Sequence, residues 1–376
     1  MTVKPKIWLS PPHMGGSEQD FINDAFKTNF IAPVGHNITG FETDLETYLS
    51  NNSYAIALTS GTAAIHLALV LLNVGKGDEV ICQTKTFVAS VNPVIYQGAT
   101  PVFVDSETDT WNMCPGLLEN AIKDRINKGK KPKAIIVINL YGMPYKVNEI
   151  HNIAKRYEIP VLEDSAEALG SHYHGKPCGT FGDYAVLSFN GNKIITTSGG
   201  GALIARSQQE KNKGIYLATQ AKDNSVEYNH TAIGYNYRMP NVTAGIGRGQ
   251  MQVLEKHIEL RRRNFNYYFK ELNALPEISF LQEPEGFSSN RWLTCVVFEN
   301  QKQRDDIMKL LESNNIESRP SWKPMHLQPV YKGQDAYLNG TSEDLYSKGL
   351  CLPSGSSLTI EDLERITNLI KSYFGK

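Results

Sequence analysis

The 376-residue chain lacks several features that would place it in a special class of protein. Its five cysteines are scattered, odd in number and without a C-x-x-C pair, which argues against a disulfide framework or a zinc site. No apolar run of signal-peptide length lies near the amino terminus, and polar residues 59–62 and His66 interrupt the longest apolar stretch, 55–74. We therefore expect a soluble, cytoplasmic protein without a membrane span.

The chain also lacks an excess of positive or negative charge. Lys and Arg total 38 against 39 Asp and Glu, so no basic field indicates nucleic acid or an anionic membrane as a partner. Apolar residues make up 41% and charged residues 20% of the chain, values typical of a globular protein, which exclude disorder and fibres. A small ligand is the better expectation.

Short β-rich runs alternate with amphipathic segments through residue 240, the pattern of a largely parallel sheet covered by helices. The predicted strands are 54–58, 79–83, 101–104, 134–140, 159–163, 184–189 and 202–205, and the predicted helices are 62–73, 88–97, 115–127 and 147–157. A long helical pattern follows over 241–275, and we interpret its basic triplet, 261–263, as a solvated helix face. A strand at 294–298 and helices at 303–314 and 360–374 complete an α+β region. The prediction is an α/β protein with a large domain, 1–245, and a small domain, 246–376.

Residues 59–64, Thr-Ser-Gly-Thr-Ala-Ala, follow a predicted strand and open a predicted helix. Backbone N–H groups and hydroxyls converge at such a helix N-terminus, where the helix dipole favours an anion such as phosphate. The alternative is an ordinary turn in which Ser or Thr caps the helix.

A second apolar strand ends on adjacent acids, Glu163 and Asp164, and Glu167 follows. Open α/β sheets place ligands at the carboxyl ends of their strands, so one acid should face a site. A carboxylate there could bind a metal, cap a helix or hold the N–H of a pyridinium ring. A metal is disfavoured, because the nearest imidazoles, His172 and His174, fall in a turn.

Lys193 follows a third strand, with Ser188 upstream and three consecutive glycines, 199–201, downstream. A lone lysine after a strand usually reaches solvent. The flanking hydroxyl and glycines instead indicate close approach to a bulky group, and a lysine held there can form a Schiff base. A phosphate cup, an acid for a pyridine nitrogen and a lysine for an aldehyde together predict pyridoxal 5′-phosphate (PLP). No G-x-G-x-x-G or Walker motif supports a nucleotide site instead.

These motifs resemble those of the DegT/DnrJ/EryC1/StrS family of sugar aminotransferases over nearly the whole chain. The resemblance implies fold type I, with a three-layer α/β/α large domain, and a homodimer with active sites at its interface. It implies that Phe87 stacks on the pyridine ring, that Asp164 holds the ring nitrogen and that Lys193 forms the Schiff base. The other cofactor contacts implied are Ser60, Gly61, Thr62 and Ser188 at the phosphate, Glu167, Asn190, and Asn236 from the partner subunit.

Glu167 departs from the family pattern. Many relatives carry Gln at this point, hydrogen-bonded to the phenolic oxygen of the cofactor, and two oxygen anions would repel there. We expect Glu167 to be protonated, or to face a substrate hydroxyl or water. The alternative is that it caps the following helix.

Two further segments, 9–16 and 319–329, resemble the family branch that aminates UDP-4-keto-6-deoxy-N-acetylglucosamine. Relatives that act on GDP-4-keto-6-deoxymannose keep His-Leu-Gln-Pro but usually lack the preceding Trp-Lys. The resemblance implies transfer from L-glutamate to the C4 keto group, through the pyridoxamine 5′-phosphate (PMP) form, for bacterial glycan synthesis. The implied substrate contacts are His13, Pro33, Gly35, Arg319, Trp322, Lys323 and His326, and local packing of a Pro-rich loop is the alternative for Trp322 and His326.

The sequence disfavours two rivals to a transaminase. A dehydratase of the same family replaces the Schiff-base lysine with histidine, so Lys193 argues against it. A non-catalytic sensor that binds PLP or a sugar nucleotide is disfavoured because Lys193, Asp164 and Ser188 are all present.

Overall fold

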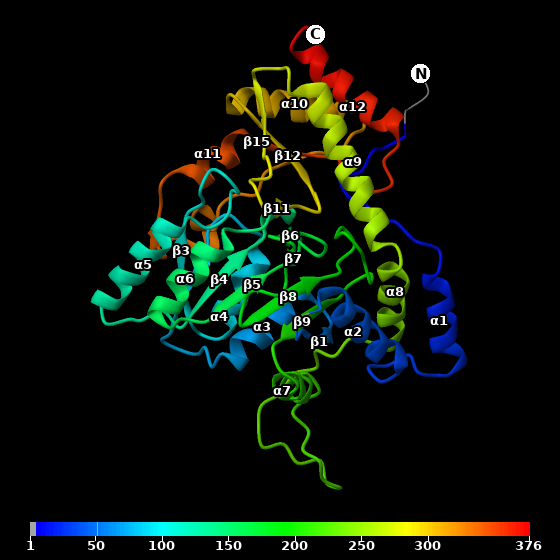
Figure 1. Ribbon diagram of the computed structural model, residues 1–376, viewed down its shortest axis with the longest axis vertical. Helices are drawn as coiled ribbons and strands as arrows, with labels where there is room; N and C mark the ends of the chain where they lie inside the picture. Colours follow the sequence, from blue (N-terminus) through cyan, green and yellow to red (C-terminus); the bar gives the residue numbers. More distant parts are fainter. Residues whose placement is uncertain (1–4, 51) are drawn as a thin grey trace.

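A computed structural model of the chain describes residues 5–50 and 52–376 and is built around one large sheet (Figure 1). Its strand order is β1-β9-β8-β5-β4-β2-β3-β14. Only β9 runs against its two neighbours, so the α/β prediction with a mostly parallel sheet is confirmed. The strands are β1 (Tyr54–Leu58), β2 (Glu79–Gln83), β3 (Thr100–Val104), β4 (Ala134–Ile138), β5 (Val161–Asp164), β8 (Tyr184–Ser188), β9 (Gly201–Ala205) and β14 (Ala336–Tyr337).

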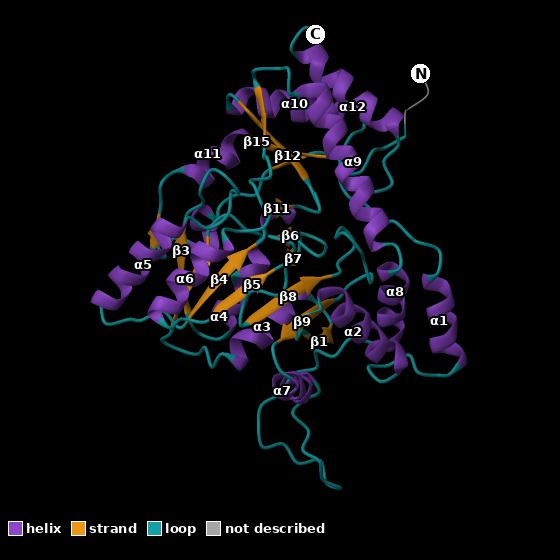
Figure 2. Ribbon diagram, viewed as in Figure 1, coloured by secondary structure: helices purple, strands orange, loops and turns teal. Residues whose placement is uncertain are grey.

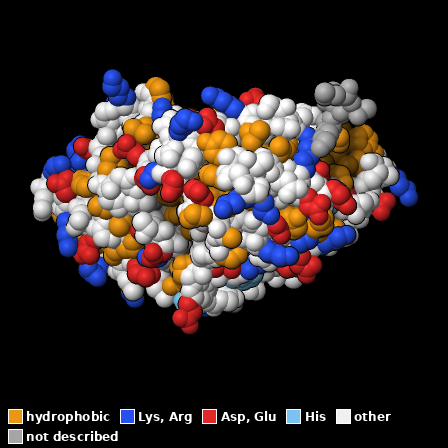
Figure 3. Space-filling view, turned by 90° about the horizontal axis from the view of Figure 1, so that it is seen from above, with side chains coloured by type: hydrophobic (Ala, Val, Ile, Leu, Met, Phe, Trp, Pro, Cys, Tyr) orange, Lys and Arg blue, Asp and Glu red, His pale blue; other side chains and the backbone are white. Residues whose placement is uncertain are grey.

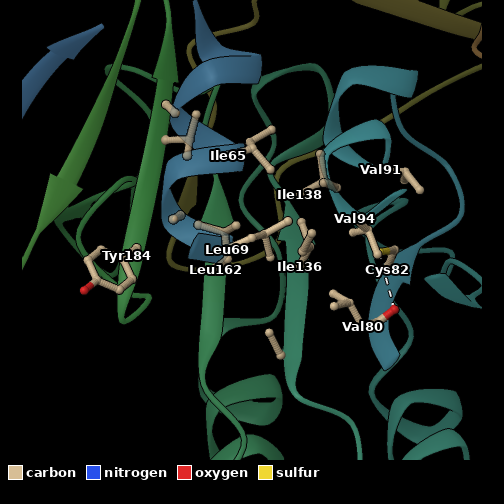
Figure 4. Packing of buried hydrophobic residues seen from close by; sticks show 14 of the residues in the cluster. Ile65, Leu69, Val80, Cys82, Val91, Val94, Ile136, Ile138, Leu162 and Tyr184 are labelled. Carbon is tan, nitrogen blue, oxygen red and sulfur yellow. Dashed lines mark hydrogen bonds between the residues drawn. The ribbon is translucent and has the colours of Figure 1, made fainter. Parts of the chain in front are cut away.

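Helices cover both faces of the large sheet (Figure 2). On one face, α3 (Gly61–Leu71) sets Ile65 and Leu69 against Ile136 of β4 and Leu162 of β5 (Figure 4). On the other face, α5 (Pro115–Asn127) and α6 (Val147–Tyr157) pack over the alternate residues of the same strands. Strands buried on both faces read as continuous apolar runs, which is why the sequence predicted them.

A second sheet, of four strands, belongs to a separate core. Its order is β10-β12-β15-β13, formed by β10 (Ile278–Phe280), β12 (Thr294–Phe298), β15 (Gly349–Leu352) and β13 (Arg319–Pro320). The helices α9 (Leu254–Leu272), α10 (Gln301–Ser313) and α12 (Ile360–Tyr373) share this core. We call this sheet with its three helices the small unit. A three-stranded sheet of β11 (Phe287–Ser288), β6 (His172–Tyr173) and β7 (Lys176–Pro177) lies apart from it.

Two segments cross the boundary expected at residues 245 and 246. Ile7 is buried in the core of the small unit and pairs with Ile316, although it lies near the start of the chain. β14, from the C-terminal part, extends the large sheet beside β3. The two parts of the structure are therefore interlaced.

The expected helix over 241–275 is two helices, α8 (Asn241–Met251) and α9, separated at residues 252 and 253. α8 packs against α1 (Glu18–Lys27) and α2 (His36–Leu49), whereas α9 packs against α12. Because the two helices have different partners, the chain changes direction between them (Figure 1). The expected helix 88–97 is also divided, into a 3-10 turn at 88–90 and α4 (Asn92–Tyr96), since Pro93 lacks the N–H that a continuous helix would need.

The basic triplet is not a solvated helix face, which corrects the sequence interpretation. Arg261 is 1% exposed, and its guanidinium donates to the Trp292 carbonyl and to Ser10 Oγ. Arg262 forms an ion pair with Glu283. Arg261, on the inner side of α9, hydrogen-bonds to a backbone carbonyl instead of water. Helical periodicity does not indicate such a partner, because it only separates apolar from polar positions.

The surface carries both signs of charge. Figure 3 shows Lys and Arg interspersed with Asp and Glu over one face, in agreement with a net charge of −1. Across residues 5–50 and 52–376, the helices are all too short or too polar to cross a membrane.

Candidate active site

A cavity of about 510 Å³ opens where strands of the large sheet end. Ser60 follows β1, while Asp164 and Ser188 are the last residues of β5 and β8, and all three line it. The opposite wall comes from the small unit and its connecting loops, and includes Trp292 and Trp322. A ligand in this cavity would contact both parts of the protein.

Another cavity, of about 570 Å³, lies between Trp111 and Phe287. Among its charged groups, Lys146 lies 2.6 Å from Asp109 and Glu283 binds Arg262, while Glu149 is exposed. None of the residues expected at the site lines it, so the candidate site is the cavity at the strand ends.

One end of that cavity suits an anion. Ser60 is the N-cap of α3, and its Oγ accepts the Ala63 N–H at 3.0 Å. The N–H groups of Gly61 and Thr62 precede the first helical hydrogen bond and remain available at the positive end of the helix. Ser188 adds a hydroxyl beside Gly61, where a Cβ would lie 3.1 Å from Ser188 Cβ. The capping turn is therefore present, and it leaves the N–H groups that an anion would need, so the two expected alternatives are compatible.

Two of the three consecutive glycines, Gly200 and Gly201, serve packing within the protein. Gly199 and Gly200 line the cavity, but a Cβ on Gly199 would meet nothing within 4 Å. A Cβ on Gly201 would lie 2.4 Å from Gly61 N, so β9 can pass the turn before α3 only without a side chain. Close approach at Gly201 is thus between two backbone segments, and the expected approach of a bulky ligand does not explain it.

The adjacent acids at the end of β5 have different environments. Glu163 accepts the N–H groups of Gly179 at 2.7 Å and of Phe181 at 2.9 Å, away from the cavity. Asp164 lines the cavity and accepts the hydroxyl of Ser90 at 2.7 Å. Burial raises the pKa of Asp164, an effect that the Ser90 hydrogen bond opposes.

Lys193 and Glu167 face each other across the cavity floor. Lys193 Nζ lies 3.6 Å from Glu167 Oε1 and 4.2 Å from the centre of a Trp292 ring. Glu167 also accepts the Tyr141 N–H at 2.6 Å. Burial raises the pKa of Glu167 to about 7, although the Lys193 charge and the Tyr141 hydrogen bond lower it. No helix follows directly after Glu167 in the described chain, so the alternative that it caps one is wrong.

Glu167 should make the stability of the apoprotein depend on pH. Its pKa rises from 4.5 to about 7 on folding, so the folded protein binds more protons between these values and the free energy of unfolding falls as pH rises. Between about pH 5 and about pH 8, the free energy of unfolding of wild type should fall by up to about 3 kcal/mol because of Glu167. In Glu167→Gln this part of the decrease should be absent. Denaturant unfolding of both apoproteins across this range measures the difference. Equal pH slopes would contradict the assignment.

Two residues expected at the substrate also line the cavity. The Trp322 ring packs 5.5 Å from Phe87 and 5.0 Å from Tyr141, measured between ring centres. Arg319 donates to Glu317 Oε1 at 2.9 Å, and both side chains lie on the cavity wall. The wall therefore combines an aromatic face with a paired cation.

Eleven expected residues line this cavity and six do not. Those that line it are Ser60, Gly61, Thr62, Phe87, Asp164, Glu167, Ser188, Asn190, Lys193, Arg319 and Trp322. Those outside it are His13, Pro33, Gly35, Asn236, Lys323 and His326.

The imidazole rings of His326 and His13 are both in contact with other side chains of the protein. His326 Nδ1 lies 2.7 Å from Thr84 Oγ1 and its Nε2 lies 3.1 Å from Glu343 Oε1, so it joins the Pro-rich loop to the end of β2. These hydrogen bonds within the chain agree with local packing of the Pro-rich loop, the alternative to a substrate contact for His326. His13 stacks on His257 with ring centres 4.8 Å apart.

Gly35 and Asn236 also lie away from the cavity. Gly35 precedes α2 at φ 151°, and a Cβ there would lie 2.3 Å from Asn241 Cγ. The Asn241 carboxamide accepts the Asn37 N–H and thereby caps α2, which accounts for Gly35 by packing. Asn236 is exposed and forms a β-bridge with Thr219.

Sequence reasoning missed Ser90, Trp292 and Glu317. Ser90 follows Phe87 by three residues, and one 3-10 turn brings it to Asp164. Glu317 stands two residues before Arg319 on a strand-like segment, so alternation could have indicated a shared face. Trp292 has no local pattern that marks it.

Known proteins resemble the chain over nearly its whole length. The model of the DegT/DnrJ/EryC1/StrS aminotransferase family matches residues 12–371. EpsN of Bacillus subtilis (strain 168), which carries the name of a pyridoxal phosphate-dependent aminotransferase, is 46% identical over 373 residues, covering 98% of this chain and 96% of EpsN. GDP-perosamine synthase of Escherichia coli O157:H7 is 35% identical over 363 residues, covering 96% of this chain and 97% of that protein.

A solved structure extends the likeness to the fold. Spr1654 of Streptococcus pneumoniae, named as a sugar aminotransferase and solved in its PLP form, superposes with a TM-score of 0.91 at 27% identity, covering 98% of both chains. A PMP form of the same protein matches with a TM-score of 0.89. The family match, the fold type I architecture and the cavity at the strand ends agree, so the chain belongs to the DegT/DnrJ/EryC1/StrS family and is a PLP-dependent sugar aminotransferase.

Proposed function

We propose that this enzyme transfers the amino group of L-glutamate to the C4 keto group of a nucleotide-linked 4-keto-6-deoxy sugar. The observation that carries the proposal is the convergence of a helix N-terminus, a buried carboxylate and a lysine in one cavity. Each suits a different part of PLP.

The cavity residues fit PLP. The free N–H groups of Gly61 and Thr62, with the hydroxyl of Ser188, suit a phosphate. Phe87 is half exposed beside Trp322 and can cover an aromatic ring. Asn190, on the loop before Lys193, completes the cofactor set that we propose. When bound, PLP supplies a ring that accepts electrons from the carbon next to the amino nitrogen.

Lys193 is the residue to which we assign proton transfer. It is the only lysine that lines the cavity within the described chain. Lys193 would hold PLP through its Nζ, and as a free amine it would supply the base and acid that proton transfer at the donor Cα needs. The Trp292 ring beneath Nζ and the Glu167 carboxylate beside it restrict where the amine can point.

Asp164 and Glu167 have separate roles in this proposal. Asp164, oriented by Ser90 and the Ala166 N–H, holds a proton on the pyridine nitrogen through a charge-assisted hydrogen bond. Glu167, whose pKa burial raises to about 7, can carry a proton of its own at neutral pH. A protonated Glu167 can donate a hydrogen bond to the phenolic oxygen of the cofactor. The repulsion between two oxygen anions, expected for Glu in place of Gln, would then not arise.

A second copy of the chain is part of the proposal. Asn236 is exposed and lies outside the cavity of its own chain, and we assign it to the phosphate of a partner subunit. The preceding loop exposes Val226, Tyr228 and Ile233 almost completely, which favours burial against another protein surface. We also propose that residues 1–245 form a PLP-binding domain and 246–376 a small domain, with Ile7 and β14 as segments that cross between them.

For the acceptor we propose UDP-4-keto-6-deoxy-N-acetylglucosamine. Trp322 and Arg319 on the cavity wall support it, because they belong to the segment that resembles the UDP-sugar branch. The second candidate is GDP-4-keto-6-deoxymannose, favoured by the 35% identity to GDP-perosamine synthase.

A competition between the two acceptors tests the proposal. We expect the purified enzyme with PLP and L-glutamate to aminate the UDP-linked sugar with a kcat/KM at least about tenfold above that for the GDP-linked sugar, identified by NMR of the product. The reverse order would establish the second candidate. Failure with both sugars would overturn the substrate proposal and leave the cofactor assignment standing.

A further inference from the structure

The loop that carries Lys193 is held by hydrogen-bond donors from outside the large sheet. Three consecutive carbonyl groups, at residues 192–194, each accept a side-chain hydrogen bond. Asn192 accepts from Ser10 Oγ and from Trp292 Nε1, both at 2.8 Å. Ile194 accepts from His257 Nδ1 at 3.2 Å, and the carbonyl of Lys193 itself accepts from a guanidinium at 3.5 Å.

That guanidinium belongs to Arg261, which also contacts both residues that donate to Asn192. Besides the Lys193 carbonyl, it donates to Ser10 Oγ and to the carbonyl of Trp292. Ser10 in turn donates to Asn192, and the Trp292 ring lies 4.2 Å from Lys193 Nζ. Arg261 therefore contacts both the backbone of Lys193 and the residue beneath its amine.

Stability alone does not account for an arginine at this position. Arg261 is fully buried, its Nε has no partner, and no ion pair to it occurs among residues 5–50 and 52–376. Burial lowers the pKa of Arg261 to about 9, which reflects the cost of an unpaired interior cation. A methionine would fill much of this volume without that cost.

The helix that presents Arg261 has its other end in the small unit. His257 and Arg261 are one turn apart on α9, so both reach the Lys193 loop from the same side. Further along α9, Tyr268 and Leu272 are buried in the core of the small unit. Figure 1 shows α9 passing from the level of the large sheet to that unit.

We propose that Arg261 is a positioning residue for Lys193: it fixes the Lys193 backbone and Trp292 together, so that Nζ is presented to the cofactor. This inference rests on the covalent role proposed for Lys193. Small displacements of a reacting group of about 1 Å can slow a reaction by about 100-fold, so loss of this anchor should affect bond formation more than ligand binding.

The test compares Arg261→Met with Arg263→Met. Arg263 lies on the same helix and donates to the Leu358 carbonyl at 2.6 Å, away from the Lys193 loop. Two quantities are measured for each protein: the rate at which PLP and borohydride label Lys193, followed by peptide mass spectrometry, and the affinity for PMP. PMP has no aldehyde, so it reports binding without covalent attachment.

We expect Arg261→Met to label Lys193 at least about tenfold more slowly while its PMP affinity stays within about twofold of wild type. Arg263→Met should match wild type in both. Unchanged labelling of Arg261→Met, or an equal loss of PMP affinity, would overturn the proposal. If Arg261→Met does not fold, Arg261→Lys, which keeps the charge and loses the two-pronged donor, carries the same test. Wild-type protein that is not labelled at Lys193 would instead refute the proposed function.

Discussion

Replacing Lys193 with Ala should abolish transamination, with kcat lowered by about 10⁴-fold or more. The substitution removes the amine that lines the cavity at 3.6 Å from Glu167, so no group remains to attach the cofactor or to move the proton between carbons. Product formation from L-glutamate and the preferred sugar nucleotide measures the loss.

A second lysine provides the control for this experiment. Lys270 lies on α9 with its side chain 82% exposed, so Lys270→Ala should retain the wild-type rate. A Lys193→Ala protein that transaminates at a rate near that of wild type would contradict the role assigned to Lys193.

Asp164→Asn should produce the next largest effect, a decrease in kcat of about 10²- to 10³-fold. The carboxamide has the same shape but no charge, so it cannot hold a proton on the pyridine nitrogen, and the ring then accepts electrons poorly. The rate of reaction of the PLP form with L-glutamate alone, followed by absorbance, isolates this effect from the choice of sugar.

The neighbouring acid offers a matched comparison. Glu163→Gln alters a carboxylate that accepts three backbone N–H groups, from Gly179, Phe181 and Gly182, outside the cavity. We expect it to lose about 1–3 kcal/mol of stability and to keep the kcat of the folded protein. If Asp164→Asn kept its rate while Glu163→Gln lost it, the two acids would have been assigned to the wrong faces of β5.

The large sheet could be predicted because its strands are apolar on both faces. In β4, Ile136 and Ile138 contribute to one core while Ile135 and Val137 contribute to the opposite one, so the sequence reads as a continuous apolar run. Helix α2 was missed for the opposite reason. Its start depends on Asn241, more than 200 residues away in the chain, which accepts the Asn37 N–H. That contact leaves no local pattern, although Ile38, Phe41 and Leu45 recur at helical spacing further along the helix and could have indicated it.

The same distinction applies to the site. Ser60, Asp164 and Lys193 follow strands or end them, so their order along the chain already places them at one edge of the sheet. Trp292 and Arg261 reach the site through the packing of the small unit, which no motif encodes. His326 shows the limit of a motif, which indicated the substrate without showing that the side chain is held by Thr84 and Glu343.

Identification of the lysine that PLP modifies tests the central claim most directly. Wild-type protein is incubated with PLP, reduced with borohydride, digested and mapped by mass spectrometry. We predict a single labelled peptide, with the label on Lys193, and loss of transamination in proportion to labelling. A label on another lysine such as Lys85, which is buried outside the cavity lining, or full activity after complete reduction would contradict the assignment of this cavity as the active site.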